Sequence, residues 1–166
     1  MNLRKLKQKD APFMLEWMHD ETIIENMKTN FASKTIEDCK AFIKMAQDYS
    51  SDLHLAITDD KDIYMGTVSL KHIKDGVAEF AIAVRKSAMG QGYSKFAMTE
   101  IIKIGFNKLK LNMIYWCVSP DNKRAIRFYD KEGYNRVNGD LLCIGWGGGR
   151  YSQEQTSHYI WYQETI

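Results

Sequence analysis

The sequence contains few cysteines, and their arrangement is not that of a disulfide-stapled or zinc-binding protein. The chain has three, odd in number and widely separated, with no CxxC pair: Cys39, Cys117 and Cys143. Neither a disulfide framework nor a zinc site is indicated. The four histidines show no ligand spacing either, so we expect no bound metal. Because the first ten residues lack the long apolar segment of a secretory signal, we expect a reduced, cytoplasmic protein.

Long apolar runs and blocks of one charge are also missing. No apolar run approaches the roughly 18 residues of a membrane span, so we expect no membrane partner. The formal net charge is only +2, and lysine and arginine are interspersed with aspartate and glutamate. This pattern predicts no nucleic-acid partner. With 166 residues, 45% of them hydrophobic, the chain is long enough to bury a core, and we expect one domain spanning residues 1–166.

Hydrophobic periodicity predicts both strands and helices. Strand patterns occur in seven segments, which are residues 2–7, 53–58, 64–72, 77–84, 113–118, 140–146 and 157–163. Helical spacing occurs in five segments, which are residues 11–18, 22–27, 33–46, 94–109 and 121–132. The last two strands flank a glycine triplet, residues 147–149, that is expected to form a hairpin turn. An antiparallel meander followed by a strand–helix–strand crossover predicts a mixed sheet and an α+β (mixed α/β) fold.

The most informative segment is residues 78–94, where an apolar strand carrying Glu79 enters a loop with Gly90 and Gly92 and then a long helix. Two glycines at a strand-to-helix junction let backbone N–H groups surround a bulky anion, and the helix N-terminus adds roughly half a positive charge. The loop lacks the third glycine of a dinucleotide fingerprint and is not a Walker loop. It predicts a phosphorylated ligand, with a plain glycine-rich turn as the alternative.

A second signal lies in the helix at residues 121–132. Asn122, Ala125, Ile126 and Tyr129 are spaced at i, i+3, i+4 and i+7, which places them on one helix face. The alternative is a core-facing stripe in which the tyrosine only packs. Because Asn122 opens the helix directly after a strand, at the sheet edge where ligands tend to bind, it is a candidate ligand contact.

Together these segments resemble the GNAT superfamily of N-acetyltransferases. The resemblance covers nearly the whole chain and is carried by Ala78-Glu79-Phe80, by residues 89–94, and by Asn122, Ala125, Tyr129 and Gly133-Tyr134. It implies a central mixed, mostly antiparallel sheet flanked by helices. Leu15-Glu16-Trp17 and Met65-Gly66 look like the branch that acetylates ribosomal-protein N-termini and nucleotide-linked amino sugars. Met89 stands where the family has Gln or Arg, so backbone amides are expected to hold the pyrophosphate more nearly alone.

The resemblance implies acetyl-CoA as co-substrate and direct attack of a primary amine on it in a ternary complex. Glu79 is the candidate base, directly or through water, unless its carboxylate lies on the outer surface of the sheet. Tyr129 resembles the tyrosine that donates a proton to the coenzyme A sulfur. The pantetheine arm is expected between the strands at 77–84 and 113–118. The candidate cofactor contacts are Ile82, Ala83, Val84, Met89, Gly90, Gln91, Gly92, Tyr93, Ser94 and Asn122.

The acceptor is expected to be a small-molecule amine, such as an amino sugar on a nucleotide carrier. The candidate acceptor contacts are Trp17, His19 and Phe31, with Met27 and Trp146 as further candidates. Two alternatives remain open, a protein N-terminal acetyltransferase and a non-catalytic acyl-CoA-binding module. The aromatic strand at residues 158–162 looks exposed and is a candidate for pairing across a homodimer.

Overall fold

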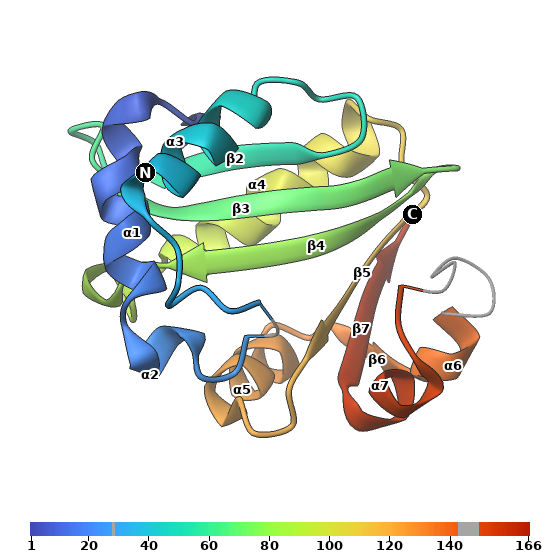
Figure 1. Cartoon of the computed structure of the whole chain (residues 1–166). Helices are drawn as coiled ribbons and strands as arrows, with labels where there is room; N and C mark the ends of the chain where they lie inside the picture. The colour runs from blue at the N-terminus through green and yellow to red at the C-terminus, as the bar shows by residue number, and fades with distance from the viewer. Residues whose placement is uncertain (28, 143–149) are drawn as a thin grey trace.

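A computed structural model describes residues 1–27, 29–142 and 150–166 and contains one seven-stranded sheet (Figure 1). The strands lie in the order β1-β2-β3-β4-β5-β7-β6, and every neighbouring pair is antiparallel except β4 and β5. Their bounds are β1 Asn2–Lys5, β2 Leu53–Thr58, β3 Tyr64–Lys74, β4 Val77–Val84, β5 Met113–Val118, β6 Asn135–Val137 and β7 Ile160–Thr165. The predicted mixed, mostly antiparallel sheet is confirmed.

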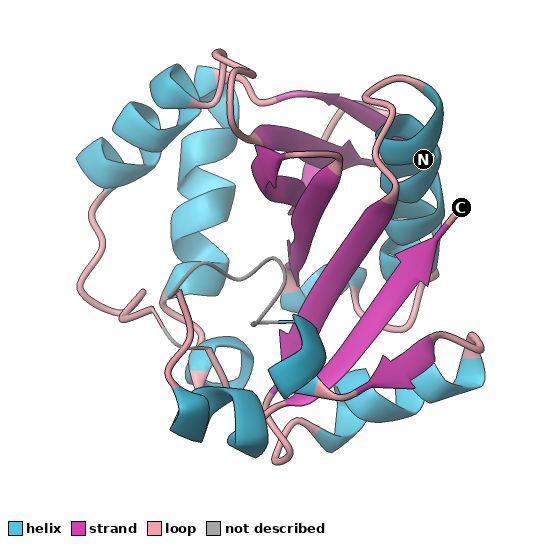
Figure 2. Ribbon diagram, turned by 90° about the vertical axis from the view of Figure 1, so that its right-hand side faces the viewer, coloured by secondary structure: helices cyan, strands magenta, loops and turns pink. Residues whose placement is uncertain are grey.

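Helices cover both faces of this sheet (Figures 1 and 2). Three N-terminal helices lie on one face: α1 Ala11–Met18, α2 Glu21–Ile24 and α3 Ile36–Met45. The opposite face carries α4, Tyr93–Asn107, whose Ala97, Met98 and Ile101 are completely buried against the strands. The chain continues with α5 Lys123–Lys131, α6 Gly139–Leu142 and α7 Gln153–His158, and two short 3-10 helices span Gln8–Asp10 and Lys86–Ala88. No helix in the described parts of the chain is long and apolar enough to cross a bilayer.

The two parallel strands β4 and β5 pair only over a short stretch and then diverge. Their pairing runs from Val77 opposite Met113 to Glu79 opposite Tyr115, although β4 continues to Val84 and β5 to Val118. Beyond Glu79, β5 keeps its antiparallel pairing with β7 and leaves β4 at an angle, as Figure 1 shows. The backbone of β4 that faces the gap is therefore available to an extended ligand.

The C-terminal part of the fold differs from the prediction. The expected strand at 140–146 is wrong at its start, because Gly139–Leu142 forms α6, and its remainder, with Trp146 and the glycine triplet, lies outside the described residues. Residues 157–158 belong to α7, which Ser152 begins by accepting a hydrogen bond from the Gln155 amide. The short strand β6 was not expected. β7 pairs with β5 and β6 and not with a hairpin partner.

The position of β7 also corrects the expectation that the C-terminal strand is exposed. Both of its edges are paired within the sheet, and Trp161 and Tyr162 are only 2% and 0% exposed. Trp161 donates its indole N–H to the Thr156 carbonyl at 2.9 Å, which ties the strand to α7. The sheet order therefore leaves residues 161–163 without a free edge for pairing across a homodimer.

Candidate active site

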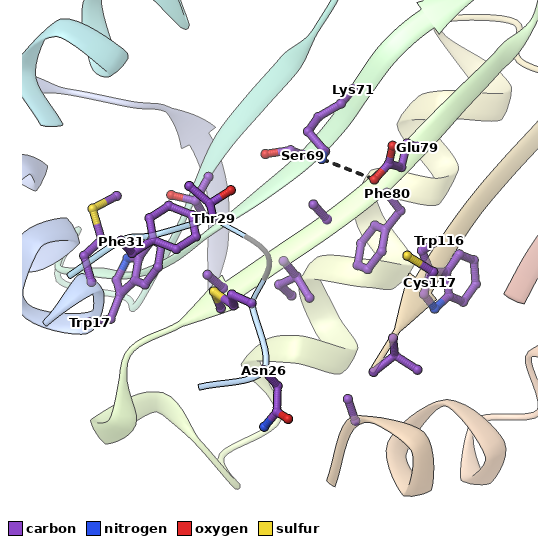
Figure 3. A pocket seen from close by; sticks show the side chains of 18 of the residues that line it. Trp17, Asn26, Thr29, Phe31, Ser69, Lys71, Glu79, Phe80, Trp116 and Cys117 are labelled. Carbon is purple, nitrogen blue, oxygen red and sulfur yellow. Dashed lines mark hydrogen bonds and ion pairs between the residues drawn. The ribbon is translucent and has the colours of Figure 1, made fainter. Parts of the chain in front are cut away.

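A cavity of about 670 Å³ begins among the N-terminal helices, crosses the faces of β3 and β4, and ends at the start of α5 (Figure 3). Its walls bring together residues from distant parts of the chain. Seven of the predicted site residues line it, namely Trp17, Phe31, Glu79, Ile82, Ala83, Asn122 and Tyr129. The gap between β4 and β5 forms part of this cavity, because residues of both strands line it.

Glu79 lies on the cavity side of β4 and is 7% exposed. Its Oε1 accepts a hydrogen bond from the Tyr151 hydroxyl at 2.7 Å and one from Lys71 Nζ at 3.3 Å, and Figure 3 shows the latter as a dashed line. Its Oε2 lies 3.9 Å from His72 Nε2. The side chain is therefore buried inside the cavity and does not lie on an outer surface of the sheet.

Tyr129 reaches the same cavity from α5. This helix begins after Asn122, whose Oδ1 accepts a hydrogen bond from the Ala125 amide at 3.0 Å. The Tyr129 ring packs edge-on against Trp116 at 5.4 Å and is 7% exposed. Burial, reinforced by the neighbouring Tyr162 and Tyr134, raises the pKa of the Tyr129 phenol above its ordinary value. The phenol is consequently a protonated donor at neutral pH.

The glycine loop leads directly into α4 with its backbone in a left-handed conformation. Gly90 and Gly92 have φ angles of +76° and +86°, which a side chain would strain. Gly92 is the N-cap of α4, and since it has no side chain to accept a hydrogen bond, the first amides of the helix point outward without a side-chain cap. An anion is the natural partner for such amides.

Several loop residues contribute backbone or structural contacts rather than side chains that face a ligand. The ring of Tyr93, the first residue of α4, is buried in the core, and Val84 at the end of β4 is buried in the same core. The Gln91 amide donates to the Ser87 carbonyl at 2.5 Å, whereas Ser94 is half-buried. The sulfur of Met89 accepts a hydrogen bond from Arg124 of α5. The cation of Arg124 therefore lies next to the position where the family motif has a polar side chain.

The acceptor end of the cavity is aromatic. The Trp17 indole donates to the Tyr64 hydroxyl at 3.0 Å, and the Phe31 ring packs edge-on against Trp17 at 5.1 Å. Met27 also lines this end. His19 does not, because as the exposed C-cap of α1 it directs its ring nitrogen to the Lys34 carbonyl at 2.9 Å. His19 is therefore not among the residues that line the cavity, and its predicted contact with the acceptor stays a prediction.

Sequence patterns did not predict several polar cavity residues, which come from β2, β3 and the C-terminal segment. The floor beside Glu79 carries His54, Ser69 and Lys71, and Tyr151 closes over it. Strand register was the signal for the first three, since His54 faces Ser69, and Lys71 faces Glu79, on one side of the sheet. Tyr151 carries no such signal because it lies between elements. Burial raises the pKa of its phenol above the ordinary value, so it donates to Glu79.

No group of three or more histidine, cysteine, aspartate or glutamate side chains within the described ranges is placed to hold a metal ion. The glycine loop, the unpaired backbone of β4 beyond Glu79, and the buried carboxylate and phenol are suited to a long phosphorylated thioester and an amine. This is the combination that acetyl transfer requires.

Comparison with known proteins agrees with this arrangement. Residues 1–135 match the family model for the Acetyltransferase (GNAT) domain. The chain is 25% identical over 139 residues to Acetyltransferase PseH of Campylobacter jejuni, covering 84% of this chain and 85% of that protein. It is 24% identical to the spermidine N(1)-acetyltransferase of Escherichia coli strain K12 over 159 residues, covering 91% and 81%.

Solved structures share the fold. The spermidine N-acetyltransferase of Vibrio cholerae in complex with CoA and spermine has a TM-score of 0.73 at 20% identity, with 82% of this chain and 81% of that chain covered. The PaiA N-acetyltransferase of Thermoplasma acidophilum in complex with coenzyme A has a TM-score of 0.72 at 16% identity, with 99% and 98% covered. The chain belongs to the GNAT acetyltransferase family and is an acetyl-CoA-dependent N-acetyltransferase.

Proposed function

We propose that the protein acetylates the primary amine of a small molecule that carries its own negative charge, such as a nucleotide-linked amino sugar. The observation that carries this proposal is the continuity of the cavity, which runs from the aromatic end at Trp17 and Phe31, past Glu79, to Tyr129 and Asn122. Such a cavity would hold the coenzyme and the acceptor at the same time. It is suited to direct attack of the amine on the thioester in a ternary complex.

The coenzyme would bind mainly to backbone atoms. Its pyrophosphate would receive hydrogen bonds from the amides of residues 90–94 at the positive end of α4, with the Arg124 cation nearby. Its pantetheine arm would extend the sheet along β4 at Ile82, Ala83 and Val84, in the gap where β5 has diverged. The Asn122 side chain, with its oxygen committed to capping α5, would offer its amide N–H groups.

Two side chains would handle the protons. Glu79 would take a proton from the attacking nitrogen, directly or through one water molecule. Tyr129, which its buried environment keeps protonated, would donate to the thiolate as it leaves. Backbone N–H groups of β4 near Ile82 would stabilise the oxyanion that develops on the acetyl carbonyl.

The charges of the cavity wall favour this acceptor class over polyamines. Two carboxylates line the cavity, and both are occupied: Glu79 is paired with Lys71, and Asp38 accepts hydrogen bonds from Thr35 at its own helix N-terminus. Lys34 and Lys71 balance them. A polyamine with several positive charges would find no surplus of negative charge here. Lys71 is already paired with Glu79, so Lys34 and the aromatic faces are what the wall would offer to an anionic carrier.

A polyamine acceptor is the second candidate, because several similar proteins are named spermidine acetyltransferases. A protein N-terminus is the third, and it would need an open, acidic surface around the cavity mouth.

The test is acetyl-CoA turnover, measured as thiol release, with nucleotide-linked amino sugars, spermidine and peptides offered in parallel. We expect the amino sugars to give the highest kcat/KM, and preference for spermidine would refute the proposed acceptor class. Tyr129→Phe and Glu79→Gln should each lower kcat about 100-fold or more. Tyr49→Phe and Glu100→Gln are the matched controls outside the cavity. Undiminished turnover in the first pair would contradict the assigned roles.

A further inference from the structure

Three polar side chains form a line that starts at the cavity floor next to Glu79 and leads away from the cavity. His54 Nδ1 lies 2.7 Å from Ser69 Oγ, and His54 Nε2 lies 3.7 Å from Asp52 Oδ2. Ser69 and His54 both line the cavity, and Figure 3 shows Ser69 beside Lys71 on the same side as Glu79. In the strand register Ser69 faces Ala81, and the next residue pair on this side is Lys71 with Glu79.

The surroundings fix the direction of the hydrogen bond between these two side chains. The Asp52 carboxylate is held in place because its Oδ1 accepts the backbone N–H of His72 at 2.7 Å. A carboxylate beside Nε2 favours the tautomer that carries its proton on Nε2. His54 Nδ1 is then an acceptor, so Ser69 donates its hydroxyl proton to it. The lone pairs of Ser69 Oγ remain for a donor in the cavity.

The His54 ring is also kept neutral. It is 5% exposed and packs edge-on against Phe42 of α3 at 4.9 Å. Burial lowers its pKa below the ordinary value, and the charge of Lys71 acts in the same direction against the opposing effect of Asp52. These are the charged groups that face the ring from β3 and from the start of β2. A neutral imidazole that is hydrogen-bonded to a hydroxyl can accept a proton through it.

We propose that Ser69 and His54 relay the first proton away from the acceptor amine, which arrives as an ammonium ion. The ammonium N–H bond breaks as its proton passes to Ser69 Oγ, and the Ser69 hydroxyl proton passes to His54 Nδ1. His54 becomes an imidazolium, and its Nε2 proton passes to solvent at the partly exposed Asp52, which leaves the ring protonated on Nδ1. After the product has left, Nε2 takes up a proton from solvent at Asp52 and Nδ1 releases its proton through Ser69 to water in the cavity, which restores the starting tautomer. The inference rests on the proposed function and deepens it.

The relay accounts for one of the two protons that leave the acceptor nitrogen, because Glu79 is assigned only the other. An amine nitrogen that starts as an ammonium ion loses two protons when it becomes an amide, whereas the thiolate takes up only one. The Oε1 atom of Glu79 already accepts two hydrogen bonds, from Lys71 and Tyr151. The relay takes the ammonium proton, which must leave before the nitrogen can attack. Glu79 receives the second proton, which the nitrogen releases after the attack.

The experiment measures kcat/KM from pH 6 to pH 10 with the panel amine that the wild type uses best. At pH 7, His54→Gln and Ser69→Ala should each lose about 100-fold, and the loss should shrink at least tenfold at a pH where the amine is already neutral. Ser69→Thr, which retains the hydroxyl, should keep most of the activity. His158→Gln, at an exposed histidine of α7, is the matched control. An undiminished rate, or a loss that is equal at every pH, would overturn the relay.

A second measurement does not depend on turnover. Nitrogen NMR of the wild-type His54 ring should show the neutral tautomer with its proton on Nε2 at pH 7, and Ser69→Ala should shift the Nδ1 resonance. A proton on Nδ1, or an imidazolium at pH 7, would refute the relay even if no amine in the panel is acetylated. Absence of turnover in the wild type would refute the proposed function instead.

Discussion

The two ends of the cavity are built from different materials. The proposed coenzyme end consists of backbone: the edge of β4 that diverges from β5 lines the cavity, and the glycine loop with the N-terminus of α4 lies beyond the lining residues. The acceptor end consists of side chains that come from α1, the segment before α3, β2, β3 and the C-terminal segment. A backbone site tolerates changes of sequence as long as the conformation persists. The ligand preference of a side-chain site depends on the identity of each contacting residue.

The largest effect on ligand binding is expected for a substitution in the glycine loop, at the proposed coenzyme end. Gly90→Val should weaken coenzyme A binding about 100-fold, because a side chain would occupy the space in which the pyrophosphate meets the loop amides, each charge-assisted hydrogen bond there contributing about 1.5–3 kcal/mol. Binding can be measured by calorimetry on the variant.

Gly133→Val is the matched control for that substitution. Both glycines have a positive φ, +76° and +82°, and at both positions an added Cβ meets no atom within 4 Å. Both variants should therefore lose about 1–2 kcal/mol of folding stability from backbone strain alone. Equal loss of coenzyme binding in the two would show that strain, and not the loop site, is responsible.

The difference between the two ends also explains what the sequence could predict. A loop with two glycines before a helix, and an asparagine that caps the next helix, are local patterns whose geometry follows from backbone preferences. The sequence therefore indicated Gly90, Gly92 and Asn122, and the face that carries Tyr129. Strand alternation alone left the side on which Glu79 lies undecided, because that side depends on which neighbours the strand acquires.

The acceptor end depends on contacts between distant segments, and local patterns do not encode them. His19 lies only two residues from Trp17, yet it falls at the helix end and outside the cavity. Tyr151 reaches Glu79 across 72 positions of sequence. The last strand was expected to begin at residue 157, three residues before the start of β7, because the capping box of Ser152 and Gln155 begins a helix that runs to His158.

A smaller effect is expected at the side-chain end. Phe31→Ala should raise the acceptor KM about tenfold, since the ring is half-buried, packs against Trp17 and is otherwise placed to contact the acceptor. The dissociation constant of coenzyme A should not change. Phe106→Ala, at a half-buried phenylalanine of α4, is the control for lost packing. A change in coenzyme affinity in Phe31→Ala would mean that the two ends are not separate sites.

The smallest effect is expected at Met89, whose side chain lies in the glycine loop. Met89 offers only a weak sulfur acceptor, which Arg124 already uses. Met89→Gln would introduce an amide donor next to the loop and release the guanidinium for the phosphates. A hydrogen bond of about 0.5–1.5 kcal/mol should tighten coenzyme A binding about threefold. Met65→Gln, at a half-buried methionine outside the loop, should leave the affinity unchanged. If Met89→Gln instead weakens binding, the contact between Met89 and Arg124 itself orders the loop, and this end would depend on side chains as the acceptor end does.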